Sequence, residues 1–183
     1  MRASVSEQEE LFLNMDLGEA SPIWDRARLS TDIREDLAEL EDNYDMILDN
    51  CQKALNCAYL WKRNEELTST WFVFPLINQG VWQEAQCRVC SDLVKLLHKL
   101  DSLLVDCVFG NVFISMLPAN ASISEHRGMT NVRLRCHYGV EVPKDTENCF
   151  MMVGDEKFNW EDGRCVVIDD SFKYRITSGV TTQ

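Results

Sequence analysis

The stretch from residue 126 to residue 138 constrains the fold of this chain more than any other part of its sequence. From residue 132 onward it alternates strictly between apolar and basic positions. The apolar positions are Val132, Leu134, Cys136 and Tyr138, and the positions between them are Arg133, Arg135 and His137. An alternation with a period of two is typical of a β-strand with one buried face. The opposite face would present two guanidinium groups and an imidazole about 7 Å apart in one row, a pattern that can hold an anion.

A histidine stands shortly before this predicted strand. His126 is followed by the turn-forming run Gly128-Met129-Thr130-Asn131, and its position makes it a candidate metal ligand. Two interpretations stay open for each half of the stretch. His126 is either a metal ligand or a hydrogen-bonded histidine at the mouth of a barrel. Arg135 and His137 are either an anion-binding pair or a structural row that acidic residues of the barrel neutralise.

Helical periodicity precedes the strand pattern along the chain. Apolar residues recur every three or four positions over residues 31–55 and again over residues 84–100, which predicts two long amphipathic helices. Short apolar runs bounded by turn residues predict strands at residues 71–77, 103–109, 112–117, 132–142, 149–153, 164–168 and 172–176. Gly110-Asn111 is expected to form a hairpin turn. This order predicts an α+β chain whose second half is a β-sandwich or barrel.

Acidic residues are concentrated near the N-terminus. The chain has 18 basic and 30 acidic residues and a net charge of −12, and residues 1–50 alone contain 14 acidic and four basic residues. We expect a solvated acidic face, with residues 1–24 as an acidic, poorly ordered tail. Binding of nucleic acid is not expected, because phosphate contacts need a basic surface. We also expect no membrane segment and no signal peptide, and therefore a cytoplasmic location.

Several other residues carry weaker signals. The eight cysteines are expected to be reduced thiols. Cys87-x-x-Cys90 has the spacing of a zinc or redox motif, but no second cysteine pair or histidine stands at metal spacing nearby, so a structural role is expected. We assign no role to His98. Asp169 and Asp170 are expected to act mainly as turn and capping residues.

Four segments share the pattern of one known family. They are residues 126–143 (His-Arg-Gly-Met-Thr-Asn-Val-Arg-Leu-Arg-Cys-His-Tyr-Gly-Val-Glu-Val-Pro), 158–163 (Phe-Asn-Trp-Glu-Asp-Gly), 168–172 (Ile-Asp-Asp-Ser-Phe) and 114–118 (Ile-Ser-Met-Leu-Pro). Over about residues 25–183, the chain resembles the Fe(II)/2-oxoglutarate-dependent aspartyl/asparaginyl β-hydroxylases and their domain-containing relatives. The resemblance implies helices at about residues 25–100, packed on a double-stranded β-helix, a cupin-like jelly roll, at about residues 101–183. It leaves open whether the last strand of that β-helix is present.

The resemblance also implies an activity and roles for individual residues. The activity is hydroxylation of the β-carbon of an Asp or Asn in a protein or peptide substrate, with Fe(II) and 2-oxoglutarate as cofactors. His126 would be the first metal ligand, Arg135 and His137 would contact 2-oxoglutarate, and Met116 would help to line its pocket. Gly128 stands where many other oxygenases carry a metal-binding carboxylate, and the family is similar in lacking it. No further catalytic residue is assigned.

Two features depart from the family pattern. The family places its second metal histidine at the end of Asp-Asp-Ser-Phe-x-His, and Tyr174 stands at that position here. Neutral tyrosine is a weak ligand, and free tyrosine has a pKa of about 10. The family also has an arginine about one strand later that binds the far carboxylate, and this sequence ends before it, at Gln183. Two interpretations follow: a dioxygenase of this family, or a truncated pseudoenzyme that acts as a protein- or anion-binding module.

Overall fold

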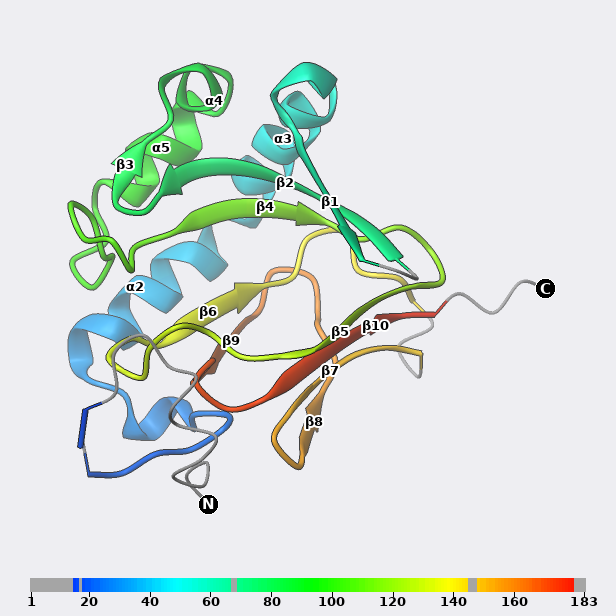
Figure 1. Ribbon diagram of the computed structural model, residues 1–183. Coiled ribbons are helices and arrows are strands. Elements are labelled where there is room, and N and C mark those ends of the chain that lie inside the picture. Colours follow the sequence, from blue (N-terminus) through cyan, green and yellow to red (C-terminus); the bar gives the residue numbers. More distant parts are fainter. Residues whose placement is uncertain (1–14, 17, 67–68, 145–147, 180–183) are drawn as a thin grey trace. The chain divides into compact units, whose positions relative to one another are not determined.

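The first and last parts of the chain come together in one structural unit, and the middle part forms another. Unit 1 consists of residues 1–29 and 119–183, and unit 2 consists of residues 30–118 (Figure 1). The structure, a computed structural model, describes residues 15–16, 18–66, 69–144 and 148–179. Within these ranges, no helix has both the length and the apolar character needed to cross a membrane.

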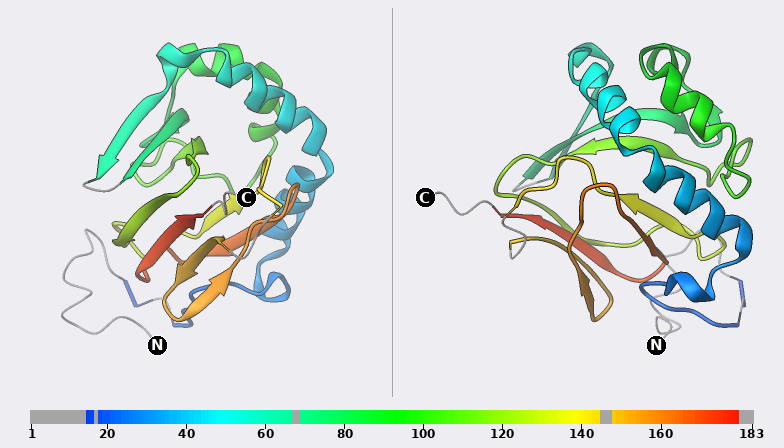
Figure 2. Two further views of the ribbon diagram at one scale, coloured as in Figure 1. Left: turned by 90° about the vertical axis from the view of Figure 1, so that its right-hand side faces the viewer. Right: turned by 180° about the vertical axis from the view of Figure 1, so that it is seen from behind.

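Two consecutive helices in unit 2 replace the first predicted long helix. Ser30 caps helix α2 (Thr31–Asp42), because its side chain accepts a hydrogen bond from the first turn at 3.4 Å. Helix α3 (Tyr44–Leu55) begins after Asn43, whose φ of −108° and ψ of 27° leave the helical range. The side-chain amide of Asn43 donates to the Glu39 carbonyl at 2.8 Å. Asparagine competes with the helix backbone in this way, so the prediction of one continuous helix is wrong at this residue. Figure 2 shows α2 and α3, coloured blue to cyan, one after the other.

The second predicted helix is also divided. Helices α4 (Glu84–Val89) and α5 (Ser91–Leu97) meet at Cys90, whose φ is −105° and ψ is 47°. The buried side chains of α5 are Leu93, Leu96 and Leu97. These leucines belong to the apolar stripe that the sequence predicts, so the periodicity identifies the buried face although it misses the break.

Four antiparallel strands form the sheet of unit 2. They are β1 (Lys62–Glu66), β2 (Ser69–Asn78) and β3 (Val81–Trp82), in that order, and β4 (Val112–Met116), which also pairs with β2. A short 3-10 turn, η2 (Ala58–Leu60), leads from α3 to β1. Figure 1 shows α3, α4 and α5 on one side of this sheet. The strand predicted at residues 71–77 is confirmed as part of β2.

The strand predicted at residues 103–109 is wrong. This segment binds the turn between β2 and β3 instead, because Gly80 donates to the Gly110 carbonyl at 2.8 Å and accepts from the Asp106 N–H at 3.1 Å. Gly80 has a φ of +78°, and a Cβ there would lie 2.4 Å from the backbone nitrogen of Cys107. Only glycine permits that conformation and that approach. The predicted hairpin at Gly110-Asn111 is therefore also wrong, since β4 pairs with β2.

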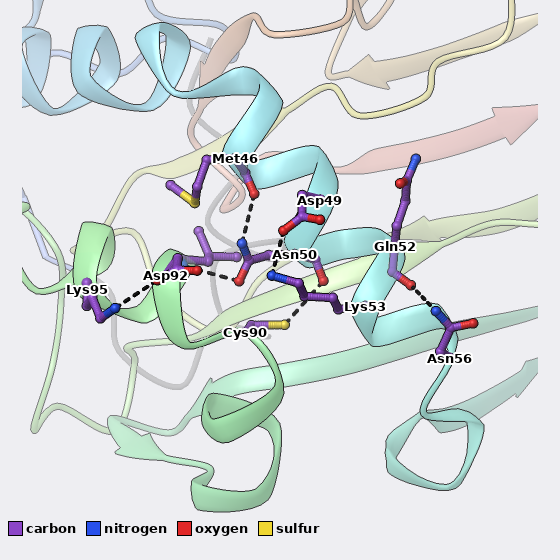
Figure 3. A network of polar contacts seen from close by, with 10 residues as sticks. Met46, Asp49, Asn50, Gln52, Lys53, Asn56, Cys90, Asp92 and Lys95 are labelled. Carbon is purple, nitrogen blue, oxygen red and sulfur yellow. Dashed lines mark hydrogen bonds and ion pairs between the residues drawn. The ribbon is translucent and has the colours of Figure 1, made fainter.

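Asn50 is buried in unit 2 and joins α3 to α5 (Figure 3). Its side-chain NH₂ donates to the Met46 carbonyl at 2.8 Å, and its Oδ1 accepts from the Leu93 N–H at 3.4 Å. Leu93 lies in the first turn of α5, whose N-cap residue Cys90 makes no side-chain cap hydrogen bond. The Cys90 thiol donates instead to the Asn50 carbonyl at 3.4 Å. A residue of α3 therefore supplies the cap that α5 lacks.

Replacing Asn50 by leucine is expected to lower the free energy of unfolding by about 1–3 kcal/mol, because it leaves the buried Leu93 N–H without its acceptor. Urea denaturation followed by circular dichroism measures this change. Gln52→Leu alters an exposed side chain of the same helix and should change the free energy by less than about 0.5 kcal/mol. Equal effects of the two variants would contradict the capping role of Asn50.

The strands of unit 1 pair in antiparallel fashion. One sheet has the order β5 (Ala121–His126), β10 (Tyr174–Ser178), β7 (Cys149–Val153) and β8 (Glu156–Phe158), and β6 (Arg135–Tyr138) pairs with β9 (Cys165–Ile168). Together with the helices of unit 2, these strands confirm the predicted α+β class. Among the described residues the sheets do not close into a barrel, so the double-stranded β-helix stays a prediction.

The strand predicted at residues 132–142 is shorter than expected. Only residues 135–138 pair as β6. At its end, the backbone of Gly139 approaches another segment so closely that a Cβ would lie 2.1 Å from the Glu161 carbonyl oxygen. Glu141 then adopts a φ of 52°, in the left-handed region. The alternating pattern therefore continues in the sequence beyond the point where the strand ends.

Residues 22–24 lie beside strand β9 in unit 1. The Trp24 N–H donates to the Val167 carbonyl at 2.9 Å, and the Asp169 N–H donates to the Pro22 carbonyl at 3.1 Å. The short turn η1 (Arg26–Arg28) follows. The core consists of Met151, Val153, Ile168, Phe172 and Tyr174, and Ala20 and Ile23 pack against it. Residues 1–14 and 17 of the predicted tail lie outside the described residues.

Candidate functional site

Strands β5 and β10 place His126 and Tyr174 side by side. The two residues are directly opposed in the antiparallel register, and their ring centroids lie 4.3 Å apart. The register shifts between Tyr174 and Ile176, and such irregularities often re-aim side chains near functional sites. The position that corresponds to the second metal histidine of the family pattern therefore faces His126.

His126 is oriented by its own strand. Its Nδ1 lies 2.7 Å from the carbonyl oxygen of Ser124. A carbonyl oxygen only accepts, so Nδ1 carries the proton and the lone pair is on Nε2. Because the side chain is exposed, Nε2 can serve as one ligand atom.

Tyr174 is a poor partner for a metal ion. Burial raises the pKa of Tyr174 above its usual value of 10.0, and the positive charge of Arg135 opposes only part of that effect. The phenol is therefore neutral near pH 7, and a neutral hydroxyl is a weaker ligand than an imidazole or a carboxylate. The charges of Asp170 and Arg133 also act on this hydroxyl. These two charged residues therefore lie close to the His126–Tyr174 pair.

Two arginines converge on one buried carboxylate. Asp170 Oδ2 lies 2.9 Å from a guanidinium nitrogen of Arg133 and 2.9 Å from one of Arg135. Asp170 is fully buried and the Arg133 side chain is 7% exposed, whereas the Arg135 side chain is 25% exposed. The cluster keeps a net charge of +1. Arg133 and Arg135 belong to the basic row predicted from the sequence, whereas Asp170 was expected to act mainly as a turn and capping residue.

Asp169 and Asp170 have different roles. The Asp169 side chain accepts a hydrogen bond from the Ser171 N–H at 3.0 Å, so the predicted turn role is confirmed for that residue. Asp170 also lies in this turn, but the expected capping role of its side chain is wrong, because its carboxylate pairs with Arg133 and Arg135. Both residues belong to a turn in which the Phe172 N–H donates to the Asp169 carbonyl at 3.3 Å.

Gly128 lies against Asp170. Its N–H donates to the Asp170 carbonyl at 2.6 Å, and a Cβ on Gly128 would lie 2.5 Å from Asp170 Cγ. The space that a side chain at position 128 would need is therefore filled by the Asp170 carboxyl group. Asp170 Oδ1 has no hydrogen-bond partner among the described residues.

His137 lies on the same face of β6 as Arg135, because the two residues are two positions apart. Its ring centroid is 6.3 Å from that of Phe158 and 6.2 Å from that of Trp160. Burial, with a further contribution from Arg135, lowers the pKa of His137 from 6.5 to about 3. The imidazole is therefore neutral at pH 7. Its Nε2 is buried and has no hydrogen-bond partner among the described residues, and a ligand oxygen would satisfy it.

The low pKa of His137 predicts a loss of stability in acid. Between pH 6.5 and about pH 3, the unfolded chain binds a proton at this residue and the folded chain does not. The free energy of unfolding should therefore fall as the pH is lowered through this window, by at most about 1.4 kcal/mol for each pH unit. Urea denaturation at several pH values measures the slope. His137→Gln should make it shallower, and a slope equal to that of the parent chain would contradict the prediction.

Cysteine and histidine residues of unit 2 form a separate group. The thiols of Cys87 and Cys90 each donate to a backbone carbonyl at 3.4 Å, and burial raises the pKa of Cys90 to about 12. Both thiols are therefore protonated near pH 7, as expected for a structural role. His98 stacks on Trp82 with ring centroids 4.3 Å apart, at the wall of a cavity of about 570 Å³.

The site residues predicted from the sequence are brought together only in part. His126, Arg135 and His137 lie in unit 1, together with Tyr174. Met116 belongs to β4 of unit 2, so its contribution to the pocket stays a prediction. Within the described ranges, no group of three or more His, Cys, Asp or Glu side chains is arranged to hold a metal ion.

These donors differ in how well they suit the two cofactors implied by the sequence. Fe(II) is not well matched, because His126 supplies one nitrogen, Tyr174 is neutral, and Asp170 Oδ2 is bound by two arginines. A carboxylate is matched better: Arg135 carries five N–H donors in a planar fork, and the orphaned Nε2 of His137 lies on the same strand face. The described residues therefore favour an acidic ligand over a metal ion.

Comparison with known proteins identifies the family. The family model described as "Aspartyl/Asparaginyl beta-hydroxylase" matches residues 31–182. The human protein "Aspartate beta-hydroxylase domain-containing protein 2" is 40% identical over 145 residues, which are 76% of this chain and 38% of that protein. The mouse protein "Aspartyl/asparaginyl beta-hydroxylase" is 30% identical over 161 residues, which are 86% of this chain and 21% of that protein. This chain thus spans well under half the length of either relative, and it belongs to the aspartyl/asparaginyl β-hydroxylase family.

Proposed function

We propose that this chain binds an oxo-dicarboxylate of the 2-oxoglutarate kind through Arg135 and His137, as a co-substrate for hydroxylation of an Asp or Asn in a protein or peptide. The observation that carries this proposal is the buried, neutral His137, whose Nε2 lacks a partner among the described residues beside a cationic side chain. The tautomer protonated at Nε2 donates a hydrogen bond to a carboxylate oxygen. Family membership supports the same class of reaction.

Charge favours this ligand. Arg133, Arg135 and Asp170 together carry +1, and His137 adds no charge at pH 7 because its pKa is about 3. A guanidinium can bind Asp170 with one edge and a second carboxylate with another, since its five donors lie in a rigid plane. Asp170 therefore holds Arg135 in place, and the partly exposed side of Arg135 gives a ligand access.

Iron binding does not follow from the same residues. His126 is a suitable first ligand, but neither Tyr174 nor Asp170 completes a set around it. The hydroxylation proposed here therefore requires metal ligands other than the described side chains.

A second candidate function is a binding module without turnover, for anions or for a protein. Tyr174 is the observation that favours it, since a buried neutral phenol occupies the position opposite His126. Such a module would keep the carboxylate-binding residues and would lack the oxidation step.

Calorimetric titration with 2-oxoglutarate tests the first proposal. Arg135→Met should weaken binding by at least about tenfold, because charge-assisted hydrogen bonds contribute about 1.5–3 kcal/mol. Arg175→Met, which removes an exposed arginine of β10, is the matched control and should leave the affinity unchanged. Absence of binding to the parent chain, or equal loss in both variants, would contradict the proposal.

Anaerobic addition of Fe(II) and 2-oxoglutarate, followed by oxygen and a peptide that contains Asp or Asn, separates the two candidate functions. Succinate formation together with a hydroxylated peptide would support the hydroxylase. Binding of 2-oxoglutarate with no succinate formed would support the binding module.

A further inference from the structure

Asn131 holds the main chain of a residue that lies 116 positions away in the sequence. Its Oδ1 accepts a hydrogen bond from the N–H of Met15 at 2.9 Å, and its Nδ2 donates to the carbonyl of the same residue at 2.7 Å. Both contacts are to backbone atoms, and Met15 as a whole residue is 49% exposed.

This pairing has the hydrogen-bond pattern of a strand partner. A side-chain amide offers one acceptor and two donors, so it can bind the N–H and the C=O of one extended residue at once. Main-chain recognition of this kind gives affinity for a peptide with little dependence on the side chain at the bound position. Asn131 therefore has the chemistry of a clamp for an extended peptide.

The clamp is attached rigidly to the candidate site. Asn131 lies in the loop between His126 on β5 and Arg135 on β6. Three contacts fix this loop: Gly128 donates to the Asp170 carbonyl, Arg133 pairs with the Asp170 carboxylate, and the Thr130 hydroxyl accepts from the Val132 N–H at 3.2 Å. A peptide held by Asn131 is therefore held by the same loop that links the candidate metal ligand to the carboxylate-binding residues.

The sequence on either side of Met15 contains both residue types named in the family description. Met15 is preceded by Asn14 and followed by Asp16, within the sequence Leu11-Phe-Leu-Asn-Met-Asp16. Asn131 therefore binds Met15, which stands in the sequence between two candidates for hydroxylation, Asn14 and Asp16. This segment is a peptide of the substrate class, already present in the chain.

We propose that Asn131 is the main-chain clamp for the peptide substrate and that the segment around Met15 of this chain occupies it in cis. The inference rests on the proposed function for the identity of the peptide class, and it adds the residue that binds the peptide and a first occupant. An Asp- or Asn-containing peptide from another protein must then displace this segment before it can bind.

The test uses the full chain and a fluorescein-labelled peptide with the sequence of residues 11–16, followed by fluorescence anisotropy. Met15→Pro removes the N–H that donates to Asn131 and should release the segment. The variant should bind the labelled peptide about tenfold more tightly than the parent chain, which is the factor for one hydrogen bond of about 1.4 kcal/mol. Met15→Ala keeps the N–H and is the matched control, which should behave as the parent does. The double variant Met15→Pro with Asn131→Ala should return to weak binding.

Two results would overturn the inference: equal peptide affinity of Met15→Pro and the parent, or undiminished affinity of the double variant. Thermal melts of all variants confirm that each is folded. Titration of Met15→Pro with 2-oxoglutarate tests the proposed function separately from peptide binding. Peptide binding without 2-oxoglutarate binding rejects the oxo-acid proposal and retains the clamp, and the reverse result rejects the clamp alone.

Discussion

Replacing Tyr174 by histidine should give this chain an affinity for divalent transition metals that is at least about tenfold higher than that of the parent. Position 174 is directly opposed to His126 on the neighbouring strand, with the present rings 4.3 Å apart. The proton on His126 Nδ1 leaves Nε2 as a ligand atom, so the substitution would place a second imidazole beside a preoriented first one. Even residues that only support metal ligands change metal affinity by about 10–100-fold, and a direct ligand should have at least that effect.

Anaerobic titration with Fe(II), and with Co(II) followed by its visible absorption, measures the gain. Tyr174→Phe keeps an aromatic ring in the core and adds no ligand, so it should match the parent. An affinity of Tyr174→His equal to that of Tyr174→Phe would show that the opposed positions do not converge on one metal ion.

Replacing Asp170 by asparagine should lower the free energy of unfolding by about 3–5 kcal/mol, the usual cost of removing one partner of a buried ion pair. Asp170 is fully buried and Arg133 is 7% exposed, so the charge of Arg133 would remain in the interior without its carboxylate. The loop between His126 and Arg135 should loosen at the same time, because Asp170 orients both arginines. Urea denaturation measures the loss of stability.

A second substitution separates the buried charge from other effects at this position. Arg133→Met combined with Asp170→Leu removes one buried charge of each sign, and it should be more stable than Asp170→Asn alone, since apolar replacements of buried ion pairs are often neutral. Asp155→Asn, at an exposed turn, should change the free energy by less than about 0.5 kcal/mol. A loss of less than about 1 kcal/mol for Asp170→Asn would mean that water reaches Arg133 and compensates its charge.

Local patterns in the sequence predicted the parts of the site that depend on neighbouring residues. The alternation after residue 132 identified Arg135 and His137 as residues of one strand face, because strand geometry alone determines which side chains share a side. The apolar stripe likewise identified the buried leucines of α5. The periodicity could not reveal the helix breaks at Asn43 and Cys90, since one residue outside the helical range leaves the apolar spacing unchanged.

Contacts between distant residues were beyond these patterns. Asp170 pairs with Arg133 over 37 positions, and Asn131 binds Met15 over 116 positions. No periodicity links such residues, so Asp170 was predicted as a turn residue and the role of Asn131 was missed. The signal that could have identified Asp170 is the row of basic residues itself, because buried guanidinium groups require a carboxylate or a comparable acceptor.

Unit 1 is built from two separate segments of the chain, and this affects the order in which the chain can fold during synthesis. Unit 2 is a single continuous segment that ends at residue 118, whereas unit 1 joins residues before 30 to residues after 118. The partners of residues 22–24 at β9 emerge from the ribosome only after the whole of unit 2 has been made. At about 5–20 residues per second, the N-terminal segment waits several seconds for them, with Ile23 and Trp24 uncovered. Chaperones that bind apolar peptides would therefore meet this segment before the rest of unit 1 does.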